Sequence, residues 1–202
     1  VNEIHADKLD DHQQVTRRHC VVMEGIPVNK GETVEQVENS VEKVLKDNLG
    51  FTEKTVLKQF DKAHRIGPVI DNSQKAIIRF GSHAFKTKVF DSKKQSNDTQ
   101  IKVRPSLTKR RQNLLQECIE SFEDIPIFHY AFADCDGDVK IKTRYKVKNK
   151  HYFNVRNGKD ISNLMVLLDS FHENNNEIYP IIDNVDPEIY DDTFCEIMMS
   201  NS

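Results

Sequence analysis

The stretch CVVMEGIP, residues 20–27, begins the pattern that decides the fold of this 202-residue chain. An apolar run that ends in glycine and proline is typical of a buried strand followed by a turn. Residues 33–49 then carry valines and leucines at helical spacing, and Thr33 with Gln36 matches a helix-capping box. Gly50 predicts the end of this helix.

The same alternation of strands and helices continues to residue 105. Residues 56–66 and 75–80 predict two strands, Ser82 predicts the start of a second helix, and residues 101–104 predict a fourth strand that Pro105 stops. A strand-helix-strand-strand-helix-strand order within about 85 residues is that of ferredoxin-like domains, which include RNA-recognition domains. We therefore expect an α+β protein with a βαββαβ domain at residues 17–105.

The second half predicts a smaller α+β domain at residues 106–171. It begins with a helix for which Ser106 is the expected cap. Strands follow at 127–133, 139–144 and 152–155, the first two joined by an Asp-Gly turn. Asp160 is the expected cap of a last helix.

Segments of different character flank these two domains. Residues 1–16 are polar, and His5, His12 and His19 recur every seven residues, so this segment is either the stub of a coiled coil or a frayed lead-in. Residues 172–202 form an acidic tail with scattered aromatic and aliphatic residues. Its composition predicts disorder, with a short docking segment as the alternative.

The charge of the chain is unevenly distributed. The total is −3, but residues 12–160 carry 28 Lys and Arg against 19 Asp and Glu, a net charge of +9. Residues 1–11 carry −3, and residues 161–202 carry −9 without any Lys or Arg. A basic body of this kind is typical of proteins that bind polyanions.

Several functional classes lack sequence support. We find no phosphate-binding loop, nucleophile elbow or paired-histidine metal motif, so we expect no enzyme, no cofactor and no metal site. Asp134, Asp136 and Asp138 resemble the start of a calcium loop, but Val139 and Tyr145 occupy positions that require glycine and glutamate. The four scattered cysteines predict free thiols. No apolar run is long enough to span a membrane, and no secretory signal is visible.

Basic residues gather on one expected face of the first sheet. Strand alternation places Lys75, Arg79, Lys102 and Arg104 opposite the apolar side chains, on the face that RNA-recognition domains present to single strands. An ordinary solvated face would show the same pattern. The aromatic residues that such domains use for stacking are replaced here by Val22, Lys75 and Ile77, so we expect little base stacking on this sheet.

Further basic residues begin the second domain. Lys109, Arg110 and Arg111 lie at a helix start, where they oppose the helix dipole and predict a phosphate site, with an indifferent surface cluster as the alternative. Further along the chain, Lys140, Lys142 and Arg144 alternate along a predicted strand. Three aromatic residues lie among them and the basic residues that follow, and each is either a base-stacking or a core residue: Tyr145, Tyr152 and Phe153.

Five short pieces of the chain occur in a familiar order: GIP at 25–27, AHR at 63–65, AIIRF at 76–80, IKVR at 101–104 and KRR at 109–111. In order and spacing they resemble the RNA-binding first-open-reading-frame protein of LINE-type (non-LTR) retrotransposons. The resemblance implies RNA held between the two domains, a trimeric coiled coil upstream and nucleic-acid chaperone activity. It also implies RNA-backbone contacts by five arginines: Arg65, Arg79, Arg104, Arg110 and Arg111. Val22 departs from the family pattern, because a basic residue is common there, and the acidic tail is not a family feature.

We therefore expect a non-enzymatic binder of single-stranded RNA or DNA with chaperone-like activity. It would belong to a cytoplasmic, and in part nuclear, ribonucleoprotein of a retroelement or of a host gene derived from one. Binding should be mostly electrostatic, weakly sequence-specific and sensitive to salt. The alternative is a protein-interaction module that assembles a complex without binding nucleic acid.

Overall fold

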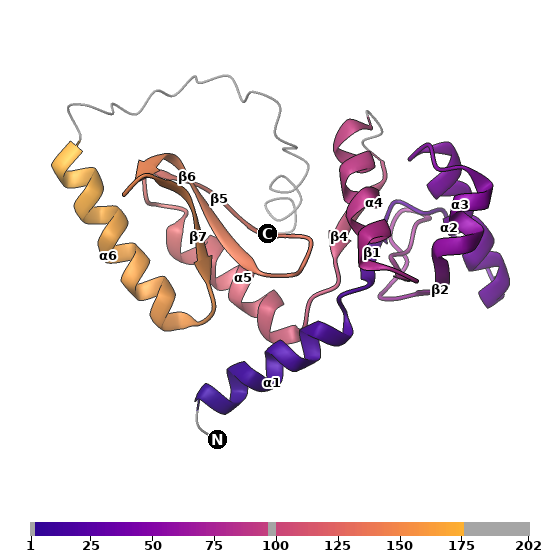
Figure 1. Cartoon of the computed structure of the whole chain (residues 1–202), viewed down its shortest axis with the longest axis horizontal. Coiled ribbons are helices and arrows are strands. Elements are labelled where there is room, and N and C mark those ends of the chain that lie inside the picture. Colours follow the sequence, from indigo (N-terminus) through magenta and orange to yellow (C-terminus); the bar gives the residue numbers. More distant parts are fainter. Residues whose placement is uncertain (1–2, 97–99, 176–202) are drawn as a thin grey trace. The chain divides into compact units, whose positions relative to one another are not determined.

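The computed structural model describes residues 3–96 and 100–175, and it divides the chain into two units (Figure 1). The first unit is Gln13–Ser106, and the second unit joins Val1–His12 to Leu107–Ser202. The division falls within helix α1 (Glu3–Thr16), which includes all the described residues of the polar segment at 1–16. The expected boundary at 105/106 differs from the observed one by a single residue.

The first unit is an antiparallel sheet with helices on one face. Its sheet has the strand order β2-β3-β1-β4. The strands are β1 (Cys20–Glu24), β2 (Phe60–Arg65), β3 (Ala76–Phe80) and β4 (Lys102–Pro105), and the helices are α2 (Val34–Asp47), α3 (Glu53–Gln59) and α4 (His83–Gln95). Side chains of α2 and α4 pack on alternate residues of β1, β3 and β4 to form a core that includes Val21, Leu45 and Ile78.

Local signals fix the ends of the two main helices as predicted. The Thr33 hydroxyl accepts a hydrogen bond from the Gln36 amide, and the Gln36 side chain accepts one from the Thr33 amide, which completes the capping box. Gly50 follows α2 with φ +72°, a conformation that glycine adopts without strain. Ser82 caps α4 by accepting a hydrogen bond from the Phe85 amide.

The predicted strand at 56–66 is wrong at its start. Residues 53–59 form α3, and β2 begins only at Phe60. The Val56 and Leu57 pair suggests an extended chain, but one helical turn after Thr52 is enough to bury Val56 in the core. The burial of Val56 thus outweighs its β propensity.

The second unit is a three-stranded antiparallel sheet with the order β5-β6-β7. Its strands are β5 (Phe128–Ala133), β6 (Val139–Val147) and β7 (Lys150–Val155), and its helices include α5 (Lys109–Phe122) and α6 (Gly158–Asn175). Leu114 and Cys118 of α5 and Leu168 of α6 share one core with Ala131 and Ile141 of the sheet. One face of the sheet is therefore covered by helices.

Two expected helix caps are corrected in this half of the chain. Thr108, not Ser106, caps α5, and its hydroxyl accepts a hydrogen bond from the Arg111 amide. Ser106 is buried in the first unit, where Gln14 and Arg17 donate hydrogen bonds to it. At α6 the side chain of Asn157 accepts hydrogen bonds from the amides of residues 159 and 160, while Asp160 accepts one from residue 156.

The remaining predictions concern the acidic tail, the cysteines and membrane-spanning segments. Residues 172–175 close α6, and the rest of the acidic tail, 176–202, lies outside the described residues. Cys20, Cys118 and Cys135 are free thiols. Within residues 3–96 and 100–175, no helix is both long and apolar enough to span a bilayer.

Candidate nucleic-acid interface

Four of the expected cations lie on, or just beside, the face of the first sheet that is opposite the helices. Arg79 of β3 and Lys102 and Arg104 of β4 alternate with buried core residues and so lie on this open face. Lys75 lies one residue before β3 and is exposed. Val22 pairs in register with Ile77 and Arg104, so the centre of the open face is apolar and aliphatic.

Acidic side chains of the same unit contact these cations. Glu24, at the end of β1, lies 2.8 Å from the Lys75 ammonium and 3.8 Å from the Arg104 guanidinium. Asp61 lies 3.3 Å from Arg79, but both side chains are largely exposed, so this ion pair contributes little in water. The open face is therefore a mixed-charge surface with cations at its edges.

Arg65 has a structural position instead of a surface one. Its side chain is only 9% exposed and forms a 2.7 Å ion pair with Glu32. The remaining guanidinium hydrogens bond to the carbonyls of Ile26, Pro27 and Gln74. Its donors are used within the unit, so Arg65 holds the loop after β1 against the β2–β3 connection.

The basic start of α5 contacts acids of α1. Arg110 pairs with Asp7, and Arg111 pairs with Asp10 at 2.9 Å, Asp11 at 2.7 Å and, from the β5–β6 turn, Asp138 at 2.8 Å. Burial lowers the pKa of Arg111, but the hydrogen bonds with Asp10 and Asp138 outweigh this effect and raise it. Carboxylates of the same chain thus occupy the expected phosphate site, and Lys109 stays exposed beside it.

The open face of the second sheet combines cations with aromatic rings. Tyr130 of β5, Lys142 of β6 and Tyr152 of β7 are in register, one beside the next. The Lys142 ammonium lies 5.2 Å from the centre of the Tyr130 ring and 5.9 Å from that of Tyr152. Phe132 extends the row, with ring-centre distances of 5.6 Å to Tyr130 and 6.1 Å to Tyr152. We call these four residues the aromatic–lysine row.

Two more of the expected cations lie near this row. Lys140 pairs in register with Phe132, and its ammonium is 2.6 Å from the Asp134 carboxylate. The hydrogen bond to Asp134 raises the pKa of Lys140. Arg144 is exposed and donates a hydrogen bond to the Phe128 carbonyl.

The sequence prediction missed Tyr130 and Phe132. Of the three aromatic residues proposed for stacking, Tyr152 lies in the row, but Tyr145 and Phe153 pack against the core. A signal was present in residues 130–133, YAFA, where aromatic residues alternate with alanine. Because Ala131 and Ala133 are buried, the larger side chains lie on the outer face.

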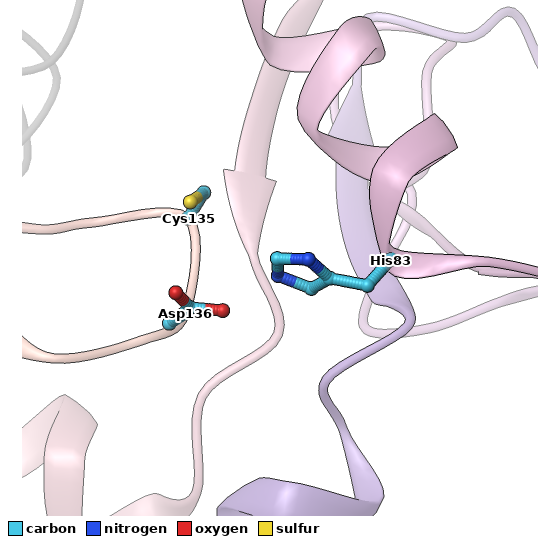
Figure 2. A group of neighbouring side chains, drawn as sticks. All are labelled: His83, Cys135 and Asp136. Atoms are coloured by element: carbon cyan, nitrogen blue, oxygen red, sulfur yellow. The ribbon is translucent and has the colours of Figure 1, made fainter.

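One further group of polar side chains, drawn in Figure 2, is His83, Cys135 and Asp136. Cys135 and Asp136 belong to the turn between β5 and β6, whereas His83 begins α4 of the first unit. The positions of the two units relative to one another are not determined, so these residues do not define a metal site.

Comparison with known protein families found no match to the chain, and comparison with curated proteins found none either.

Proposed function

We propose that this protein binds single-stranded nucleic acid, RNA in particular, and acts as a chaperone-like component of a ribonucleoprotein without catalysing a reaction. The observation that carries the proposal is the aromatic–lysine row on the open face of the second sheet. Its rings offer surfaces for bases, and Lys142 with Lys140 offers charge for phosphates. This combination is common to many proteins that bind single strands without sequence preference.

The exposure of the row supports a binding role. Tyr152 is 47% exposed, although burial of a tyrosine ring is normally favourable. On β5 the inner face holds the small residues Ala131 and Ala133, while Tyr130 and Phe132 lie on the outer face. A strand with this arrangement gains less from core burial than one with its aromatic residues inward. A ligand that stacks on the rings would recover this energy.

We propose further that the first unit is a ferredoxin-like domain of the RNA-recognition type. Its order of elements, apart from the short α3, and its strand order β2-β3-β1-β4 support this assignment. Val22 and Ile77 occupy the centre of its open face, so its contribution to binding is electrostatic, through Arg79, Lys102 and Lys75 at the edges. Kinship with LINE-type first-open-reading-frame proteins and a ribonucleoprotein setting remain proposals based on the sequence motifs.

The test compares two substitutions of the row that differ only in the ring. Tyr130→Ala with Tyr152→Ala should weaken binding of a fluorescent oligouridylate by roughly 1–3 kcal/mol per ring, about 5- to 150-fold for each. Tyr130→Phe with Tyr152→Phe keeps the rings and should bind like the parent. An abasic oligodeoxynucleotide, which has phosphates but no bases, should not distinguish the alanine pair from the parent chain.

A parent chain that fails to bind oligouridylate even at low salt would exclude the proposal.

One specific observation favours the alternative of a protein-interaction module: many of the cations already contact acids, as Glu24, Asp134 and the aspartates of α1 show. In that case the aromatic–lysine row would be a protein-docking face, and the alanine pair would abolish complex formation instead of RNA binding.

A further inference from the structure

We infer that the acidic side of α1 is an internal competitor for the basic start of α5. In this arrangement, Asp7 and Asp11 occupy Arg110 and Arg111, and a nucleic-acid phosphate must displace them to reach these cations. The inference rests on the proposed function and adds an autoinhibitory contact to it. It concerns the second unit alone, to which residues 1–12 and α5 both belong.

All three nitrogens of the Arg111 guanidinium donate hydrogen bonds within the unit. Its Nε donates to Asp10, one terminal nitrogen donates to Asp11, and the other donates to Asp138 and the Gly137 carbonyl. The Arg110 guanidinium donates to Asp7. These contacts already pair oxyanions with guanidinium groups, and a phosphate group offers the same acceptor geometry with more charge.

The carboxylates of α1 fall into two classes by burial. Asp10 is 8% exposed and also accepts a hydrogen bond from the Thr108 hydroxyl, so it anchors α1 to the start of α5. The side chain of Asp11 is 71% exposed, and that of Asp7 is partly exposed. Water reaches at least one partner of each pair, since the side chains of Arg110 and Asp11 are 39% and 71% exposed. Solvent therefore screens both ion pairs, and a polyanionic ligand can outweigh them.

The competitor also accounts for the reversed charge pattern of α5. Cations in the first turn oppose the helix dipole and so destabilise the helix. Asp7, Asp10 and Asp11 offset this destabilisation in the unbound protein. The helix start thus keeps its cations for a ligand. In the unbound protein the aspartates of α1 limit the access of other anions to these cations.

The experiment removes Asp7 and Asp11, the two α1 acids with solvent-accessible carboxylates, in the full chain. Asp7→Asn with Asp11→Asn should tighten binding of oligouridylate about three- to tenfold, the factor that two solvent-screened ion pairs correspond to. The matched control is Glu123→Gln with Asp124→Asn, at the other end of α5, which changes the net charge equally and removes two exposed carboxylates of the same unit. It should tighten binding less than twofold.

Arg110→Gln provides the second control. In that background the gain from removing Asp7 and Asp11 should fall by at least half, because one of the two competed cations is gone. Equal gains in the α1 variant and the control would overturn the inference and leave nucleic-acid binding intact. Absence of binding by the parent and by all variants would instead overturn the proposed function, and the inference with it.

Discussion

At the scale of single residues, the chemical type of a cation did not show whether the fold itself engages it. Arg65 fits the sequence pattern of an RNA contact, yet its guanidinium is paired with Glu32 and three carbonyls. A buried arginine with this many acceptors contributes to the fold. Two of its partners, Glu32 and Ile26, precede it in the chain by 33 and 39 positions, so no local sequence pattern indicates these contacts.

Arg65→Ala should therefore lower the free energy of unfolding by about 3 kcal/mol, because it leaves the Glu32 carboxylate buried without its partner. Urea denaturation measures the change. Below the unfolding transition, the affinity for oligouridylate should stay within twofold of the parent value. A variant that keeps the stability of the parent but binds oligouridylate more weakly would contradict this structural role and indicate that Arg65 contacts the nucleic acid.

Cys118 should resist alkylation in the folded protein. Burial raises its pKa to about 12, so at pH 8 it holds roughly a thousandfold less thiolate than an ordinary cysteine. Only the thiolate is nucleophilic, and the side chain is also fully buried. Mass spectrometry after iodoacetamide treatment should find Cys118 unmodified in buffer and modified in urea. Modification in buffer at the rate of the denatured protein would contradict this packing.

At the scale of elements, strand alternation predicted which residues share a face, and in the first sheet it also predicted which face is covered. Residues 130–133 show where that inference stops. Alternation places Tyr130 and Phe132 on the same face of the strand. The greater gain from burying large apolar side chains, however, predicts that this face is the core face and that the alanines face the solvent. The opposite arrangement holds because α5 and α6 pack on the alanine side.

The turn after β1 depends on a close approach that only glycine permits. Gly25 has φ +82°, and a Cβ there would lie 2.0 Å from the Gln100 carbonyl oxygen. Gly31 has a similar φ of +74° with open space around it. Gly31→Ala should thus cost only the backbone strain, about 1–2 kcal/mol, whereas Gly25→Ala should cost several kcal/mol more or prevent folding. Thermal denaturation of both variants measures the difference, and equal losses would exclude the close approach.

At the scale of the whole molecule, a near-neutral total charge conceals segments of opposite sign. The structure shows that part of this opposition is resolved by direct contact, since three aspartates of the acidic start of the chain meet the basic start of α5. The effective positive charge available to a ligand is therefore smaller than the +9 of residues 12–160 suggests.

Salt dependence should report that available charge. If about six phosphates are contacted, a plot of log affinity against log salt should have a slope near −4 for single strands. Lys142→Gln should reduce the steepness by about 0.7, the contribution of one phosphate. Tyr152→Phe, in the same row, should leave the slope unchanged. A slope near zero for the parent chain would contradict electrostatic binding.

The sequence by itself determined the α+β class, the position of most strands and helices, and the capping of α2 and α4. These features follow from hydrophobic periodicity and from hydrogen bonds within a few residues, which are local. Only the tertiary structure decided which cations are engaged by acids, why residues 56–59 are helical, and which face of the second sheet carries Tyr130, Phe132 and Tyr152. Each of these depends on packing between residues distant in the chain, where burial and pairing outweigh local preference.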